Sequence, residues 1–298
     1  MNGLESFPTN YVGLTDNAEG VRLGRKLYGR VKNDFDPKSI PGLKYWVTTR
    51  YPTMFQNLNS LTNPAVNDGD PVGTWQDLSG SNVHVSGNTN AQRPTLITTP
   101  SGWKGVMADG VDDMMLAVNR SFVNFLHNNQ GTIFVVARPS QDNAKDTHIF
   151  ILGNNGTGNT GFHFLHHSYA PYSWSYIVYT SGASKIINNF GTSQLDQYTL
   201  LTALVNINDT VQRKKAEFVL NKNNINPTST NNQNPAYSEF SQGNSTYPFG
   251  LFSAGNDAAY ITGKQTVICE ILIYNRKLDS KELSYVNNNL ALLYNLNI

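Results

Sequence analysis

Side chains able to do chemistry gather in one short segment, residues 162–174, which reads FHFLHHSYAPYSW. In an extended chain His163 and His167 share one face, while His166 points to the opposite face. Two histidines on one face could bind a transition metal, but no third ligand lies at a suitable spacing. The segment therefore does not predict a metal centre of this kind.

The same segment is suited to binding sugars. Aromatic faces stack on sugar rings, while histidine, asparagine and serine supply hydrogen bonds. We predict that the contact residues of a glycan-binding surface are His163, His167, Tyr169, Tyr172 and Trp174. The alternative is that these aromatic residues pack between two sheets or at a contact between subunits. The sequence leaves both possibilities open.

Carboxylates offer two further chemistries. Asp109, Asp112 and Asp113 are oxygen ligands close in sequence and could bind calcium, although we favour the alternative that they form a hydrogen-bonded turn. Glycoside hydrolysis needs two carboxylates that flank the scissile bond. None of the six glutamates begins an alternating series of carboxylates, and Glu270 is alone in its strand. We therefore predict that the protein is not an enzyme, has no catalytic residues, and has calcium as its one candidate cofactor.

Strands must position these side chains, and several are predicted. Runs of β-branched and aromatic residues occur at 132–137, 175–179, 198–205, 216–220 and 267–274. The third and fourth runs form a plausible pair. Alternation in the last run places four apolar side chains on one face: Val267, Cys269, Ile271 and Ile273. Cys269 is then a buried small side chain and not a reactive thiol.

One helix is predicted at the carboxyl end of the sequence. Asp279 and Glu282 fit a capping box at its start. An apolar stripe follows, formed by Leu283, Val286, Leu290 and Leu293. This stripe should pack on the strands, so we expect the helix to cover an end or an edge of a β-sandwich.

Composition narrows the possible classes of protein. The 298 residues carry a net charge of +1, a single cysteine and 38 asparagines. The low net charge argues against a dedicated nucleic-acid-binding protein, which would normally show a broad basic surface. A single cysteine excludes an internal disulfide framework. No apolar run is long enough to span a membrane, and abundant asparagine favours strands joined by polar loops.

The first 40 residues differ from the rest. They lack sustained periodicity and a secretory signal peptide, and we place a domain boundary near residue 40. A basic cluster with one aromatic side chain lies within them: Arg22, Arg25, Lys26, Tyr28 and Arg30. This segment is either a solvated arm or an arm that anchors the protein on a larger assembly.

Five segments resemble the laminin-G-like modules of the concanavalin A-like lectin/glucanase superfamily, in the family's order. They are Pro41–Trp46, Gly73–Gly80, Gln92–Thr95, Asp109–Asp113 and Cys269–Leu278. The resemblance covers residues 41–298 and implies an all-β jelly roll, a sandwich of two antiparallel sheets. It also implies a glycan-binding or adhesive module, with calcium bound in some members. The alternating catalytic carboxylates of the glucanases do not occur in this sequence.

An adhesion-type sandwich without a signal peptide or disulfides is typical of a virus. We therefore expect a bacteriophage structural protein, as a head decoration, head fibre or tail fibre, made in the host cytoplasm and displayed on the virion surface. Residues 1–40 would bind other virion proteins, and residues 41–298 would bind glycans or the host surface, with homo-oligomers possible. The alternatives are a bacterial carbohydrate-binding or adhesion module, and a purely architectural capsid or tail protein.

Overall fold

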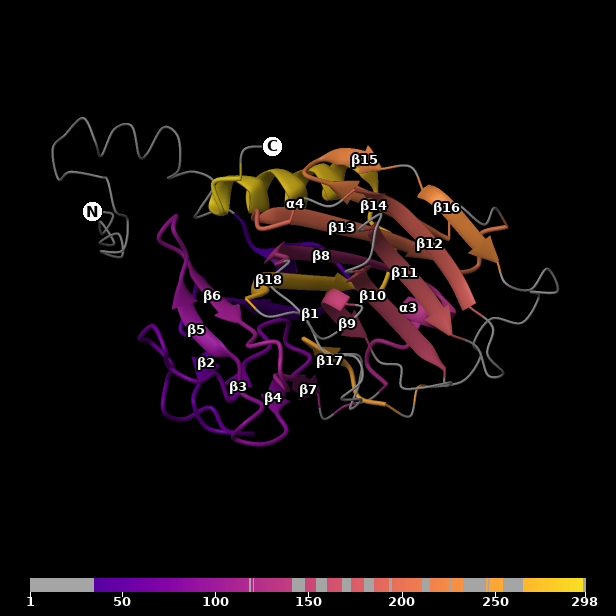
Figure 1. The fold of residues 1–298 in the computed structure, drawn as a ribbon. Coiled ribbons are helices and arrows are strands. Elements are labelled where there is room, and N and C mark those ends of the chain that lie inside the picture. The colour runs from indigo at the N-terminus through magenta and orange to yellow at the C-terminus, as the bar shows by residue number, and fades with distance from the viewer. Residues whose placement is uncertain are drawn as a thin grey trace, which may run out of the picture.

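The computed structural model shows a β-sandwich with one long helix near the carboxyl end (Figure 1). It describes residues 35–117, 119, 121–140, 148–153, 160–167, 173–179, 185–192, 195–210, 215–225, 227–232, 245, 247–253 and 265–296. Every strand pairing among these residues is antiparallel. The prediction of an all-β protein with antiparallel sheets is confirmed. No described helix is long and apolar enough to cross a membrane.

One sheet has eight strands and contains four of the five predicted ones. Its order is β15-β14-β13-β8-β18-β6-β5, and β1 also pairs with β18. The bounds are β1 Leu43–Thr48, β5 Thr95–Thr98, β6 Lys104–Met107, β8 Gln130–Arg138, β13 Thr199–Asn206, β14 Ala216–Leu220, β15 Asn223–Ile225 and β18 Val267–Tyr274. The predicted pairing of the third and fourth runs is confirmed, since β13 pairs with β14.

The second sheet has ten strands in the order β16-β12-β11-β10-β9-β17-β7-β4-β3-β2. Their bounds are β2 Met54–Phe55, β3 Thr74–Trp75, β4 Val85–Gly87, β7 Met115–Ala117, β9 His148–Gly153, β10 Gly161–His167, β11 Ser173–Tyr179, β12 Lys185–Thr192, β16 Pro227–Asn232 and β17 Gly250–Leu251. Two short helices, η2 (Pro37–Ser39) and α3 (Phe125–Asn128), lie outside the sheets.

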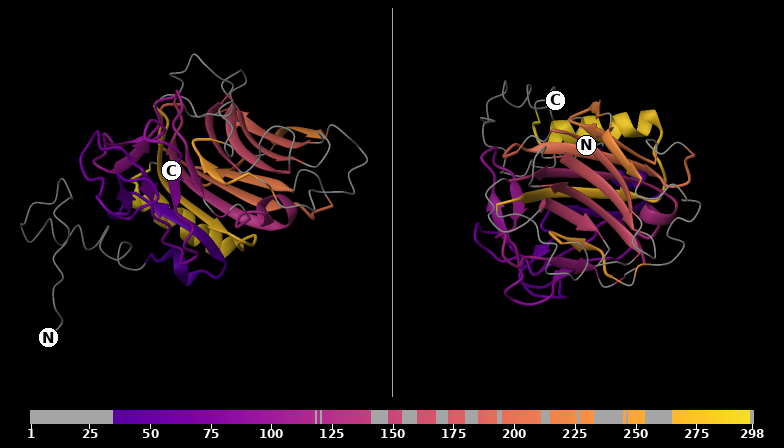
Figure 2. Two further views of the ribbon diagram at one scale, coloured as in Figure 1. Left: turned by 90° about the horizontal axis from the view of Figure 1, so that it is seen from below. Right: turned by 45° about the vertical axis from the view of Figure 1, so that its right-hand side comes forward.

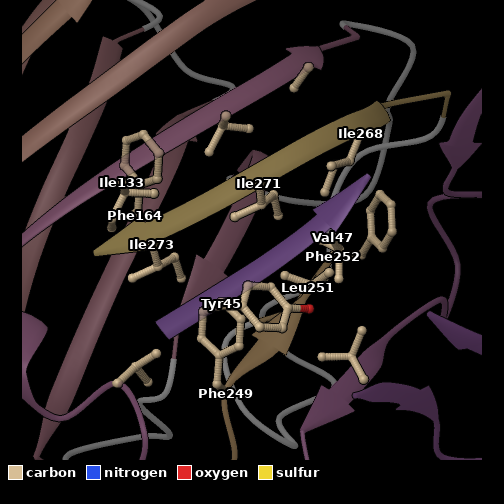
Figure 3. Packing of buried hydrophobic residues seen from close by; sticks show 14 of the residues in the cluster. Tyr45, Val47, Ile133, Phe164, Phe249, Leu251, Phe252, Ile268, Ile271 and Ile273 are labelled. Carbon is tan, nitrogen blue, oxygen red and sulfur yellow. The ribbon is translucent and has the colours of Figure 1, made fainter. Parts of the chain in front are cut away.

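Apolar side chains from both sheets meet in the space between them. Val47 of β1 and Ile271 of β18 come from the eight-stranded sheet, and Phe164 of β10 and Leu251 of β17 come from the ten-stranded one (Figure 3). All four side chains are fully buried. Burial of this apolar surface is the main force that holds the two sheets together. Trp46 and Trp75 are buried as well.

Strand β18 does not alternate as predicted. Ile271 and Ile273 face the core between the sheets, whereas Val267 and Cys269 belong to the cluster on the outer face. The register against β8 shifts between Ile268 and Glu270, as in a β-bulge. An extra residue at a bulge reverses the side-chain alternation beyond it. Cys269 is nevertheless buried as predicted, and burial raises the pKa of its thiol.

Helix α4 (Ser280–Leu293) begins with the predicted capping box. Asp279 accepts hydrogen bonds from the amides of Lys281 and Glu282, and Glu282 bonds back to the Asp279 amide. The apolar stripe packs on the strands as predicted. The helix itself lies on the outer face of the eight-stranded sheet and not at an end or edge of the sandwich (Figure 2). That face carries its own apolar cluster, with Phe134 and Leu272, which the helix buries.

One buried hydroxyl yields a stability prediction. The Tyr45 hydroxyl is buried in the core and has no hydrogen-bond partner among the described residues. Removing an unsatisfied buried polar atom relieves its desolvation cost. We expect Tyr45→Phe to raise the free energy of unfolding by about 1 kcal/mol, measured by urea denaturation.

The matched control is Tyr176→Phe in the same core. The Tyr176 hydroxyl donates a hydrogen bond of 2.7 Å to the carbonyl of Leu126. Its removal leaves a buried carbonyl without that donor and should lower the stability by about 1 kcal/mol. Equal effects of the two substitutions would contradict the prediction.

Candidate functional site

A pocket of about 340 Å³ lies on the ten-stranded sheet at its β2-β3-β4-β7 end. We name it the amide pocket. Its lining residues are Asn59, Ser60, Leu61, Thr74, Asn82, Val83, His84, Ser86 and Asn119. Side chains alternate along a strand, and Trp75 and Val85 face the core. Thr74 and Ser86, which pair across β3 and β4, therefore face outward and contribute to the pocket.

Two hydroxyls hold the loop that covers these strands. Ser86 Oγ accepts a hydrogen bond of 2.9 Å from the backbone amide of Asn59 and donates one of 2.8 Å to the Gly73 carbonyl. Thr74 Oγ1 accepts one of 3.2 Å from the Ser60 amide. A Cβ at Gly73 would collide with the backbone of Gln56 and its neighbour, so glycine is required for this close approach.

Asp77 organises the opposite wall. Its buried carboxylate accepts hydrogen bonds from the amides of Trp46 (3.0 Å), Ser79 (2.9 Å) and Val83 (3.1 Å), and from the Ser79 hydroxyl (2.9 Å). The Asp77 amide donates to Nδ1 of His84 at 3.1 Å. A backbone amide can only donate, so Nδ1 is an acceptor and the proton of the neutral ring lies on Nε2. His84 is thereby a hydrogen-bond donor at the pocket.

Two asparagines of the lining have left-handed backbone conformations, with φ of 51° at Asn59 and 56° at Asn82. Asparagine adopts this conformation more readily than most residues, which explains its use in these two turns. Leu61 adds an apolar side chain that is 40% exposed. No described lining residue is an aspartate, glutamate, lysine or arginine, so amides, hydroxyls and one imidazole define the chemistry. Such a lining suits an uncharged ligand rich in hydroxyl groups.

The predicted glycan-binding segment lies elsewhere in the same sheet, and its described side chains are buried. His163 is fully buried, with Nδ1 at 3.1 Å from the Tyr179 hydroxyl. Trp174 is 1% exposed and stacks on Phe164 at 5.6 Å between ring centroids. Side chains without exposed faces cannot stack on a sugar, so the structure corrects the prediction for His163 and Trp174. For Trp174 it agrees with the alternative of packing between sheets.

The remaining predicted contact residues are not tested. The structure describes only the backbone of His167, at the end of β10, and Tyr169 and Tyr172 lie outside the described residues. The arm residues Arg22, Arg25, Lys26, Tyr28 and Arg30 also lie outside them. Phe35 and Ile40, which precede β1, are buried in the outer cluster of the eight-stranded sheet.

The three aspartates proposed for calcium do lie together. One ligand atom from each of Asp109, Asp112 and Asp113 falls within 4.8 Å of the others. Asp109 Oδ1 accepts from the Val111 amide at 2.8 Å, and Asp113 Oδ2 accepts from the Asp109 amide at 2.7 Å. Hydrogen bonds of the predicted turn are therefore present. Oxygen ligands fit calcium, which would need further carbonyl or water oxygens, and calcium binding stays a prediction.

The burial of Asp113 predicts a pH dependence. Burial, followed by the nearby Asp109 and Asp112, raises the pKa of its carboxyl from 3.8 to about 7. The folded protein then holds a proton that the unfolded chain releases near pH 4. Stability from this group is present below pH 4 and is lost as the pH rises to 7. The loss is about 3–4 kcal/mol, at about 1.4 kcal/mol per pKa unit.

Asp113→Asn tests this prediction, since asparagine stays neutral and can still accept from the Asp109 amide. We expect the variant to be more stable than the wild type at pH 8 and nearly as stable at pH 4, measured by urea denaturation. Parallel pH profiles would contradict the prediction. Calcium would ionise Asp113, so a wild-type profile that flattens with added CaCl₂ would instead support a cation site.

Two glutamates that lie in strands, Glu270 of β18 and Glu217 of β14, form ion pairs. Glu270 is 1% exposed and bonds to the Arg50 guanidinium through both oxygens, at 2.8 and 2.9 Å. It also accepts from Trp46 Nε1 at 2.9 Å and from the Tyr294 hydroxyl at 2.8 Å. Glu217 forms a surface ion pair with Lys277. These contacts give Glu270 a structural role.

No protein-family model matches the chain, and no curated protein matches it. Among solved structures, it is similar to the sialidase of Trypanosoma rangeli in complex with 2,3-difluorosialic acid, with a TM-score of 0.52 and 12% identity over 90% of this chain and 39% of that chain. It is also similar to the binding domain of Paraclostridial Mosquitocidal Protein 1, with a TM-score of 0.51 and 17% identity over 76% of this chain and 52% of that one. The chain thus spans about two fifths to one half of these structures. The likenesses show the fold alone, a β-sandwich.

The prediction that the protein is not an enzyme is contradicted, because the first of these similar chains belongs to a sialidase, which is an enzyme. The absence of alternating carboxylates on one strand excludes only one arrangement, whereas a fold can bring carboxylates together from different strands. The laminin-G-like resemblance and the bacteriophage assignment stay predictions.

Proposed function

We propose that this β-sandwich is a glycan-binding domain whose ligand occupies the amide pocket. The pocket itself carries the proposal, because its amides, hydroxyls and imidazole match the hydroxyl groups of a sugar, and Leu61 offers an apolar surface to a ring face. The solved structures with this fold add support. One sialidase structure contains a sialic acid derivative, and the matched part of the mosquitocidal protein is a binding domain.

A more specific proposal rests on the sequence patterns. The sandwich would be a jelly roll of the laminin-G-like kind on a bacteriophage virion, with residues 1–40 as the anchor and residues 41–298 as the binding domain. Its support is the basic cluster at residues 22–30 and the family resemblance. A chain that lacks residues 1–34 should still fold, because Phe35 and Ile40 stay in place to complete the domain. It should fail to join virus particles, because most of the proposed anchor is removed.

A glycan array with the full chain tests the proposed function. The informative variant is Asn59→Gly/Asn82→Gly, which removes both amides while glycine keeps the left-handed backbone. Asn63→Gly is the matched control, because Asn63 has a φ of 59° in an exposed loop and does not line the pocket. We expect the double variant to lose at least tenfold in affinity and the control to bind like the wild type. Absence of binding to any glycan would refute the function.

A further inference from the structure

The charge around the amide pocket bears on which sugar it takes. Among its described lining residues there is no arginine or lysine, and Nδ1 of His84 is occupied by the hydrogen bond from the Asp77 amide. Acidic ligands are normally bound by cations, above all by bidentate arginine. The described lining offers an acidic sugar hydrogen bonds but no opposite charge.

A negative charge lies directly behind the pocket wall. The Asp77 carboxylate bonds to the Val83 amide at 3.1 Å, and Val83 lines the pocket. Its four hydrogen bonds come from uncharged donors, namely three amides and one hydroxyl. No cation therefore neutralises this carboxylate through those contacts. In a partly buried site its field repels an anionic ligand.

Arg93 lies against Gly87 of β4, and it donates to the carbonyls of Asn90 (2.9 Å) and Gln56 (3.0 Å). The pocket lining does not include Arg93. The pocket's volume of about 340 Å³ lies at the small end of the range for ligand pockets, about 300–1,000 Å³. This size suits one terminal sugar unit and not a long stretch of polysaccharide.

We propose that the amide pocket binds a neutral terminal sugar and discriminates against sialic acid and other acidic sugars. The side-chain amides of Asn59 and Asn82 and Nε2–H of His84 bind the hydroxyl groups of the sugar. Leu61 covers a C–H face of the sugar ring. This inference rests on the proposed glycan-binding function and goes further, because it selects the class of sugar. It also separates this chain from the sialidase that shares its fold, whose structure holds a sialic acid derivative.

The experiment compares pairs of probes that differ only in a terminal sialic acid, such as lactose and sialyllactose, together with neutral monosaccharides. Binding to the full chain is measured by saturation-transfer NMR and calorimetry. We expect neutral probes to bind at least tenfold more tightly than acidic ones. Asn59→Gly/Asn82→Gly should abolish this binding, Leu61→Ala should weaken it several-fold, and Asn63→Gly should leave it unchanged. Urea denaturation checks that the three variants are folded.

The unfavourable outcomes are distinguishable. If sialylated probes bind better and the double variant abolishes that binding, the selectivity is wrong but the pocket and the glycan-binding function stand. If glycans bind and the double variant has no effect, the pocket is wrong and the function alone stands. Arg120 follows Asn119 in the sequence. If Arg120→Ala loses binding to acidic probes, a cation recognises the acidic sugar and the inference is overturned. If no glycan binds, the proposed function fails together with the inference.

Discussion

Replacing Glu270 with alanine should lower the free energy of unfolding by about 3–5 kcal/mol. The carboxylate is buried, and it accepts four hydrogen bonds from three side chains. They are the Arg50 guanidinium, with two hydrogen bonds, Trp46 Nε1 and the Tyr294 hydroxyl. Removal of the acceptor leaves a largely buried cation and two buried donors without it, which is far costlier than the loss of a surface ion pair.

The position of Glu270 explains why the cost should spread beyond one strand. Trp46 lies in β1, Glu270 lies in β18 next to it, and Tyr294 directly follows α4. Their hydrogen bonds therefore attach the helix to the eight-stranded sheet. Arg50 further packs over the rings of Phe35 and Tyr51, at 5.8 and 5.2 Å from their centroids. Loss of Glu270 should loosen this outer layer as well as the strand.

Urea denaturation of Glu270→Ala and Glu217→Ala compares the stability lost at a buried and at a surface ion pair. Glu217 also pairs with a lysine, but at the surface, with 40% of its side chain exposed. Its removal should cost less than about 1 kcal/mol. The double variant Arg50→Met/Glu270→Met should recover part of the lost stability, because it removes both charges. A loss in Glu270→Ala no larger than in Glu217→Ala would contradict the structural role.

The second large effect is expected at Asp77, where alanine should cost about 3 kcal/mol of stability. The buried carboxylate is the acceptor for three backbone amides, from Trp46, Ser79 and Val83. In the alanine variant these three amides lose their carboxylate acceptor inside the protein. Hydrogen bonds to charged groups contribute about 1.5–3 kcal/mol each. Neighbouring backbone will relax toward water, so the total stays below the simple sum.

Asp77→Ala should also weaken glycan binding if the proposed function is correct, because Val83 and His84 form a wall of the pocket. Denaturation and calorimetry on the same variant separate the two effects. Asp70→Ala is the control, since Asp70 likewise accepts from two amides, those of Val66 and Asn67, but in an exposed turn away from the pocket. We expect a much smaller loss of stability there and unchanged binding. Similar losses at both aspartates would refute the special role of Asp77.

Local patterns in the sequence predicted local structure well. The strand at 267–274 has its predicted bounds, and the capping box at Asp279 is present. The Val111 amide donates a hydrogen bond to Asp109, as the hydrogen-bonded turn at Asp109–Asp113 requires. Each of these features depends on residues within a few positions of one another. Their spacing is sufficient because the periods of strands and helices, and the reach of a capping side chain, are set by the backbone itself.

Features that join distant residues were missed or wrong. Simple alternation in β18 failed because its bulge is defined by pairing with β8. The sugar-binding role predicted for His163 and Trp174 failed because both side chains are buried in the folded sheet. The amide pocket was not predicted, although its surroundings contain several asparagines and Gly73–Gly80 was already singled out. Its lining brings Asn59, Asn82 and Asn119 together from separate loops.

The sequence alone thus determined that the chain is an all-β protein with antiparallel sheets, a capped helix near its carboxyl end and a buried cysteine. Only the tertiary structure decided which face each side chain occupies, where a pocket opens and which carboxylates are buried. The physical reason is that secondary structure follows from interactions over a few residues. Burial, electrostatic environment and binding geometry depend instead on contacts between segments, such as Trp46 with Glu270, that lie 224 positions apart.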